Sequence, residues 1–441
     1  MMPYSRNGKK RWLIPLLYFT TSLLIIGTFV KHTTALMNIG AYTSLLLSIS
    51  VFFCNWPRLR KKLIAIYKEY QLLILLTLIF LFFTLITSLL ASYNHLFMEP
   101  LNDIYKSIRY PVILFLCLLA LSQNRFYIKY LYTIFLTTVL IILIVCPCIL
   151  YFQNKLDSFN LVKNGAVSLG FLAPFVFTVL LIDVKKYVTY TVIATIFLLF
   201  IYIIWSGSRS GLLATASSLI LISFAYIRKY EISRVKVLLF CIFSVLAFAL
   251  TLSIAYRFSP RIQEKVQQTV TFKNFTSGRT TIIRTRYPVI NQYVSFWHGI
   301  GYGNTIYQTL LHEQKAPEVI GQQNTINGKS QYFYYHDEPQ LLVIYYSIGM
   351  FGIFLYLAFF VYFTYKSWIN KTLPHSFGVL SYAIFSSLIA YFLLRGFVEH
   401  SGITLLMWLL ALQLPLTKHF SQYASVNKDD ERYSSSTYES L

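Results

Sequence analysis

The residues of this chain that are best suited to chemistry are a few cations and one histidine that border strongly apolar segments. Arg209 lies in the turn SGSRSG, residues 206–211, between two apolar runs. Glycine and serine let backbone N–H groups approach a phosphate, and the N-terminus of the following helix favours negative charge. The turn therefore predicts an anion site that includes Arg209 and Ser208. The competing interpretation is an interfacial arginine whose head group reaches the lipid headgroups.

A second basic cluster opens an earlier apolar run. Lys106, Arg109 and Tyr110 have the i, i+3 and i+4 spacing that places side chains on one face of a helix. They are candidates for binding the same anion as Arg209. Simple anchoring of the helix end at the membrane interface is the alternative.

The long polar stretch 257–338 has room for further functional groups. In it, Arg279 and Arg286, with Ile282 and Ile283 between them, predict a helix with a basic face and an apolar face that lies along the outer leaflet. The run GIGYGN at residues 299–304 follows. No βαβ unit surrounds its glycines, so we expect a tight loop packed against the membrane domain, and not a dinucleotide-binding fold.

His336 is the candidate general base, because histidine exchanges a proton near neutral pH. It stands just before Asp337, Glu338 and an apolar run, and generic polar lining is the alternative interpretation. Arg395, Glu399 and His400 bracket the last short outer turn and could pair with one another. The sequence has no HExxH, paired CxxC or Walker A motif. We therefore expect no metal and no cofactor.

The composition indicates the environment that positions these residues. The 441 residues are 56% hydrophobic and 12% charged, whereas a globular domain has roughly 25% charged residues. The net charge of +22 could suggest nucleic acid, but no soluble module with a basic face is visible. Cytoplasmic loops rich in Lys and Arg explain the charge better. The sequence predicts an all-α, polytopic integral membrane protein.

Apolar runs near 20 residues long predict about 12 transmembrane helices. The first of them is too long for the core of a signal peptide, so we expect it to stay in the membrane. The predicted spans are residues 12–30, 36–53, 71–91, 104–121, 128–152, 165–182, 187–204, 210–227, 235–256, 339–365, 376–394 and 401–417.

The short loops predict the orientation, because Lys and Arg favour the cytoplasmic side. Alternate loops are rich in these residues, which places both termini in the cytoplasm and the stretch 257–338 outside. The predicted organisation is spans one to nine in 1–256, a large outer loop with short helices in 257–338, spans ten to twelve in 339–417, and a disordered cytoplasmic tail in 418–441.

These features together resemble the O-antigen ligase and polymerase superfamily. The resemblance rests on the SGSRSG turn, on Ser277-Gly278-Arg279, on the GIGYGN run, and on His336 before a glycine-containing apolar span. The number of spans and the large outer loop before the tenth are similar too. Arg209 and Arg279 match the family's essential arginines and His336 its histidine. Where the family often has Asn two residues after this histidine, the chain has Glu338.

The resemblance implies a GT-C-like, metal-independent and inverting glycosyltransferase of the bacterial inner membrane, with its active site facing the periplasm. As an O-antigen ligase in lipopolysaccharide biosynthesis, it would move O-antigen glycan from undecaprenyl diphosphate to lipid A–core, among membrane lipids and without nucleic acid. Catalysis would fall to His336, Arg209 and Arg279. The diphosphate or lipid would be bound by Lys106, Arg109, Tyr110, Ser208 and Arg286. The alternatives are an O-antigen or capsule polymerase, a protein O-oligosaccharyltransferase, and a transporter of lipid-linked glycan.

Overall fold

The computed structural model describes most of the apolar segments and much of the stretch 257–338, which is called the outer loop below after its predicted side. The described residues are 12–30, 33–90, 98–122, 127–145, 147–148, 159–182, 186–231, 233, 253, 256–257, 263, 266–267, 279–317, 323–326, 329–332, 334, 338–397 and 402–417. His336, Glu399, His400 and the predicted tail 418–441 lie outside them, as does most of the predicted span 235–256.

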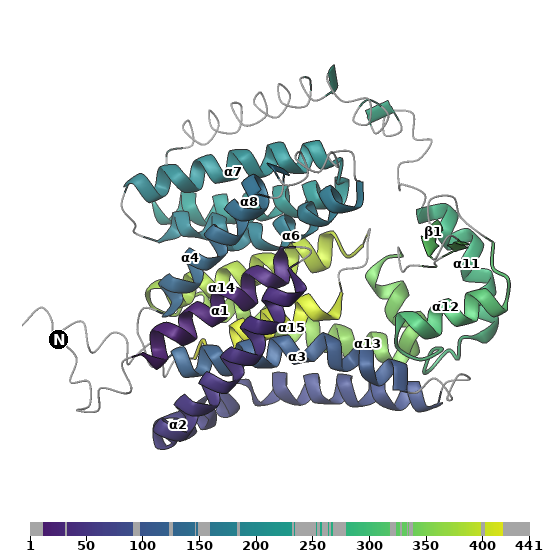
Figure 1. Cartoon of the computed structure of the whole chain (residues 1–441), viewed down its shortest axis with the longest axis horizontal. Coiled ribbons are helices and arrows are strands. Elements are labelled where there is room, and N and C mark those ends of the chain that lie inside the picture. The colour runs from purple at the N-terminus through teal and green to yellow at the C-terminus, as the bar shows by residue number, and fades with distance from the viewer. Residues whose placement is uncertain are drawn as a thin grey trace, which may run out of the picture.

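Helices make up nearly all of the described structure (Figure 1). The membrane-type helices are α1 (Leu13–Phe29), α2 (Thr34–Leu90), α3 (Met98–Leu121), α4 (Tyr127–Leu140), α6 (Phe159–Phe177), α7 (Lys186–Ser206), α8 (Arg209–Lys229), α13 (Gln340–Asn370), α14 (His375–Ser387) and α15 (Ile403–Gln413). Three of them continue into tighter or wider turns: α4 into the π-helix η3 (Ile141–Val145), α6 into the 3-10 helix η4 (Thr178–Leu181), and α14 into the π-helix η5 (Leu388–Leu394).

The described part of the outer loop forms a small unit of its own. It contains α11 (Arg279–Tyr293), α12 (Asn304–Glu313) and an antiparallel hairpin of β1 (Gln323–Ile326) and β2 (Lys329–Tyr332). The hairpin pairs Gln323 with Tyr332. Figure 1 shows α11, α12 and β1 together at one end of the helix bundle, opposite the end where α2 bends.

The described helices are those of a polytopic membrane protein. Seven of them are long and apolar enough to cross a membrane, and α1, α15 and the segment Gly165–Leu181 are shorter apolar helices. They overlap the spans expected from the sequence apart from 235–256, with two predicted spans in α2, and the number of spans stays a prediction. The all-α prediction is confirmed for these segments, with the short outer hairpin as an addition.

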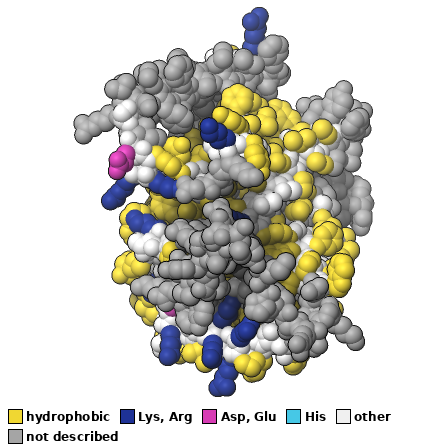
Figure 2. All heavy atoms as spheres, turned by 90° about the vertical axis from the view of Figure 1, so that its left-hand side faces the viewer, with side chains coloured by type: hydrophobic (Ala, Val, Ile, Leu, Met, Phe, Trp, Pro, Cys, Tyr) yellow, Lys and Arg dark blue, Asp and Glu magenta, His cyan; other side chains and the backbone are white. Residues whose placement is uncertain are grey.

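Helix α2 contains two predicted spans and the basic segment between them. Its 57 residues would extend about 85 Å at the α-helical rise, far beyond the roughly 30 Å hydrocarbon core of a bilayer. The backbone leaves helical geometry at Asn55 and Tyr70. Between these points Arg58, Arg60 and Lys61 are exposed. Figure 2 shows Lys and Arg side chains gathered on the end of the molecule at the left of Figure 1.

Aromatic contacts join the central helices of the bundle. The ring of Phe171 in α6 stacks on Phe29 of α1 at a centroid distance of 5.3 Å and meets Tyr391 of η5 edge-on at 5.5 Å. Phe29 also contacts Trp408 of α15 at 5.6 Å. Aromatic pairs of this geometry add about 0.5–1.5 kcal/mol beyond the area they bury. Helix α6 is thereby fixed at the centre, between α1, α15 and η5.

The outer loop docks onto a break in α13 at Gly349. Gly349 has φ 70° and ψ −169°, a conformation essentially restricted to glycine. The break frees backbone groups that the loop then satisfies: Ile300 N–H donates to Tyr346 O at 2.8 Å, Gly301 N–H donates to Ser347 O at 3.0 Å, and Met350 N–H donates to Phe296 O at 2.8 Å. Broken membrane helices need such replacement partners. The prediction that residues 299–304 pack against the membrane domain is confirmed.

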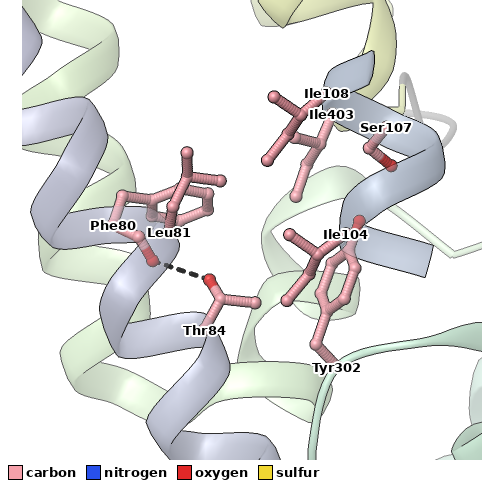
Figure 3. A pocket seen from close by; sticks show the side chains of 8 residues that line it. All are labelled: Phe80, Leu81, Thr84, Ile104, Ser107, Ile108, Tyr302 and Ile403. Atoms are coloured by element: carbon pink, nitrogen blue, oxygen red, sulfur yellow. Dashed lines mark hydrogen bonds between the residues drawn. The ribbon is translucent and has the colours of Figure 1, made fainter. Parts of the chain in front are cut away.

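Tyr302 attaches the same loop to α2 and α3. Its backbone N–H donates to Ser88 Oγ of α2 at 3.2 Å, and its side chain lines the same small pocket as Ser107 of α3. Burial and the nearby Asp103 carboxylate raise the pKa of the Tyr302 hydroxyl to about 12. Figure 3 shows its ring at a small apolar pocket whose lining also includes Phe80, Leu81, Thr84, Ile104, Ser107, Ile108 and Ile403. The loop is thus rooted in the membrane helices on two sides.

Candidate functional site

The SGSRSG turn forms the N-terminus of α8, as the sequence predicts. Gly207 takes a left-handed φ of 64°, which glycine adopts without steric cost. Ser208 is the N-cap, because its Oγ accepts the backbone N–H of Gly211 at 3.1 Å. Its own N–H donates to Ser206 Oγ at 3.2 Å. Ser208 therefore fixes the start of α8, and its contact with substrate stays a prediction.

The structure brings Arg209 and Arg279 together, although they lie far apart in the sequence. Arg209 is the first residue of α8 and Arg279 the first of α11. Both are partly buried, and each guanidinium lies within electrostatic reach of the other. Two like charges at two helix N-termini oppose one another and both helix dipoles. An anion between them would relieve these repulsions, and binding of an anion by this pair stays a prediction.

Lys106, Arg109 and Tyr110 lie on α3, and among the described residues they contact side chains of α3 and α2. Lys106 is 54% exposed, and its Nζ lies 3.6 Å from Asp103 Oδ1. The Arg109 guanidinium lies 4.3 Å from the ring centroid of Tyr110. The Tyr110 hydroxyl donates to Asn38 Oδ1 of α2 at 2.5 Å. Both cations lie in the N-terminal half of α3, and their binding of the same anion as Arg209 stays a prediction.

Arg286 lies inside the outer-loop unit, where it joins α11 to the start of α13. Arg286 and Glu338 are both 0% exposed, with Arg286 Nη1 3.6 Å from Glu338 Oε1. Tyr307 of α12 bridges them: Arg286 Nη1 donates to its hydroxyl at 2.9 Å, and that hydroxyl donates to Glu338 Oε1. Burial and the Glu338 carboxylate raise the pKa of Tyr307 well above its ordinary value. The hydroxyl therefore stays protonated as a donor.

This triad changes the interpretation of α11. Ile282, Arg286 and Ile290 form its buried stripe, so the expectation of a basic face opposite an apolar face is wrong. Arg286 can lie on the buried face because its counter-charge comes from another segment. Glu338, just before α13, supplies that charge. We assign Arg286 a structural role and leave the proposed diphosphate contact to Arg209 and Arg279.

Removing one member of this buried ion pair is expected to destabilise the protein strongly. Arg286→Met or Glu338→Leu alone leaves the other charge buried without its partner, which costs about 3–5 kcal/mol. The double variant removes both charges, so we expect it to be less destabilised than the sum of the single variants. Thermal unfolding of the purified protein in detergent measures the effect. Additive losses would show that the two side chains do not interact.

Tyr334 and Glu338, each two residues from His336 in the sequence, contact the same buried arginine. Tyr334 is buried, its hydroxyl donates to Ala316 O at 2.7 Å, and its ring centroid lies 5.2 Å from the Arg286 guanidinium. Glu338 pairs with Arg286 as described above. His336 itself lies outside the described residues, so its role as base stays a prediction. No motif marked Tyr307 or Tyr334 in the sequence, since their partners come from separate elements.

Among the described residues, no group of three or more His, Cys, Asp or Glu side chains is placed to hold a metal ion. The site that the structure does assemble is cationic. Arginine offers planar and bidentate hydrogen bonds to phosphate groups, so binding of a phosphate or diphosphate stays the prediction for these arginines.

Comparison with known families agrees with the resemblance seen in the sequence. Residues 194–357 match a family model described as O-Antigen ligase. The matched region begins within α7 and ends within α13, and it includes Arg209, Arg279 and His336. A search of curated proteins finds no match to the chain.

Proposed function

We propose that the chain, whose residues 194–357 match the O-Antigen ligase family model, is an O-antigen ligase of the bacterial inner membrane. The donor would be a glycan carried on undecaprenyl diphosphate, and the acceptor a sugar hydroxyl of lipid A–core. The observation that supports the proposal is that Arg209 and Arg279, the first residues of α8 and α11, lie within electrostatic reach of each other. Two arginines so placed would suit a diphosphate.

In the proposed reaction the two arginines stabilise the leaving group. As the bond between the anomeric carbon and the diphosphate oxygen breaks, negative charge grows on the departing undecaprenyl diphosphate. Arginines aimed at that charge bind the transition state more strongly than the ground state, which accelerates the reaction. Their attachment to helix starts limits their movement, so little reorganisation is needed when the charge develops.

His336 supplies the general base in this proposal. It accepts the proton of the acceptor hydroxyl while the hydroxyl oxygen attacks the anomeric carbon from the face opposite the diphosphate. The configuration at that carbon is inverted, and no covalent glycosyl-enzyme forms. A positioned base contributes about 10²–10⁴-fold to such a step. Holding both lipids in one site supplies the orientation.

The distribution of charge supports a periplasmic active site. Exposed cations such as Arg58, Arg60 and Lys61 lie where α2 bends, and Arg228 and Lys229 end α8. Arg209 begins α8 and so lies at the other end of that helix. Because cytoplasmic ends are enriched in Lys and Arg, we place Arg209 and the outer-loop unit at the periplasmic side.

Reconstitution tests the proposal directly. We expect the purified protein in proteoliposomes to transfer glycan from undecaprenyl diphosphate to purified lipid A–core, at the same rate with and without EDTA. Loss of transfer in EDTA, with recovery on adding a divalent cation, would contradict the metal-independent mechanism. No transfer to lipid A–core under any condition would contradict the ligase assignment.

The same experiment separates the ligase from a polymerase, which shares the donor. A polymerase would lengthen glycan on undecaprenyl diphosphate in the absence of lipid A–core. In cells, loss of a ligase leaves long glycans on the lipid carrier and bare lipid A–core, whereas loss of a polymerase leaves single repeats on the core. We expect the first pattern.

A further inference from the structure

Arg395 is a buried cation for which the mechanism above has no role. It follows η5 directly, is 2% exposed, and its guanidinium lies 4.5 Å from the ring centroid of Tyr391. Its backbone N–H donates to Ala390 O at 3.2 Å, which continues the π-helical pattern. Charged residues inside membrane bundles are costly and usually functional, and π-helical turns often occur at functional sites.

The register of two helices places Arg395 at the level of Arg209. The Tyr382 hydroxyl of α14 donates to Leu221 O of α8 at 2.7 Å. Arg209 precedes Leu221 by 221 − 209 = 12 residues, and Arg395 follows Tyr382 by 395 − 382 = 13 residues. At the α-helical rise these separations are about 18 Å and about 19 Å, and the wider turns of η5 shorten the second slightly. If the two helices are antiparallel, Arg395 and Arg209 lie at the same height.

Packing against α6 shows that the helices are antiparallel there. A Cβ on Gly170 of α6 would lie 3.8 Å from Gly211 Cα, in the first turn of α8. The next residue, Phe171, contacts the ring of Tyr391. The Arg395 guanidinium lies over that same ring. The end of η5 and the start of α8 therefore meet the same turn of α6, so Arg395 lies close to the level of Arg209.

A hydrogen bond ties the Arg395 turn to the start of α13 as well. Gly396 O accepts the backbone N–H of Gln340 at 2.9 Å. Gln340 is the first residue of α13 and stands two residues after Glu338. The Arg395 turn thus lies near two helix starts. One is the start of α8 at Arg209, and the other is the start of α13, which follows the predicted base His336 in the chain.

We propose that Arg395 is a third arginine of the donor site, which contacts the diphosphate of the lipid-linked glycan together with Arg209. This inference rests on the proposed function for the identity of the donor. Stacking on Tyr391 holds the guanidinium in one orientation, so its charge is in place before the leaving group departs. The planar guanidinium of arginine can donate two parallel hydrogen bonds to phosphate oxygens, whereas the ammonium group of lysine acts as a point charge.

Binding of undecaprenyl diphosphate to the full-length protein in nanodiscs tests this assignment, with glycan transfer measured in parallel. We expect Arg395→Gln to weaken binding by about 10-fold or more, the loss of one charge-assisted hydrogen bond, and to raise the donor KM or lower kcat. Arg395→Lys should retain part of the affinity. The matched control is Arg228→Gln, an exposed arginine at the other end of α8, which should bind and transfer as the wild type does.

The thermal unfolding midpoint distinguishes a binding role from a structural one. Weakened binding by Arg395→Lys with an unchanged midpoint supports the proposal. Wild-type affinity and kinetics in either Arg395 variant would overturn the proposal. A loss of carrier affinity that occurs only together with a lowered unfolding midpoint would overturn it as well. Because carrier binding is measured without any acceptor, a wild type that binds the carrier but transfers nothing to lipid A–core contradicts the ligase assignment and leaves the Arg395 site standing.

Discussion

Replacing His336 by alanine is expected to lower kcat for glycan transfer by about 10²–10⁴-fold, the usual contribution of a positioned general base. Binding of undecaprenyl diphosphate should persist, because the arginines proposed to hold the diphosphate are unchanged. Single-turnover transfer and carrier binding, both measured on protein in nanodiscs, separate these two effects. A variant that loses both together would show that residue 336 supports the structure of the site.

A second histidine in the same loop provides the control. His312 is an exposed residue of α12, and His312→Ala removes an imidazole of the same size from the same unit. We expect wild-type transfer from this variant. Equal rates for His336→Ala and the wild type would mean that another group takes the proton of the acceptor.

Replacing Arg279 by lysine is expected to reduce kcat by about 10²–10³-fold, the cost of losing one positioned donor to a developing negative charge. Lysine keeps the positive charge but lacks the planar fork that binds two phosphate oxygens at once. Arg279 is the first residue of α11, which fixes the position of its guanidinium group. The flexible ammonium group of lysine does not reproduce that hydrogen-bond geometry. Steady-state kinetics with varied donor concentration measure the change.

Arg284→Lys is the matched control, because Arg284 is exposed on the same helix. It should transfer glycan at the wild-type rate. Arg209→Lys should resemble Arg279→Lys, and the double variant should lose less than the product of the single losses, since the two arginines act on one group. Multiplicative losses would show that the arginines serve separate sites.

Much of the fold could be predicted from local sequence, because membrane insertion depends on the hydropathy of about 20 neighbouring residues. The predicted spans therefore agree with the described helices. The breaks in α2 at Asn55 and Tyr70 separate two runs that were already distinct in hydropathy. The break in α13 was not predicted, because a glycine within an apolar run is compatible with a continuous helix. Its geometry depends on the loop that replaces the lost hydrogen bonds.

The candidate site was predictable residue by residue, but not as an arrangement. Arg209 and Arg279 could be selected because cations are costly beside apolar segments, whereas their proximity follows from how α8 and α11 meet. Arg286 is also an arginine, and it lies on the same helix as Arg279. It could not be distinguished from a ligand-binding arginine until its partners Tyr307 and Glu338, from two other elements, were in place.

The amino-acid sequence alone determined that the chain is a polytopic membrane protein with cations and a histidine at the ends of its spans. These properties are local, since a bilayer excludes unpaired charge and accepts apolar helices wherever they occur. Only the tertiary structure decided which cations meet. Arg209 lies within electrostatic reach of Arg279, Arg286 is paired with Glu338, and the contact between Tyr382 and Leu221 helps to place Arg395 at the level of Arg209. Each of these pairings depends on helix packing between residues remote in the chain, which no local pattern encodes.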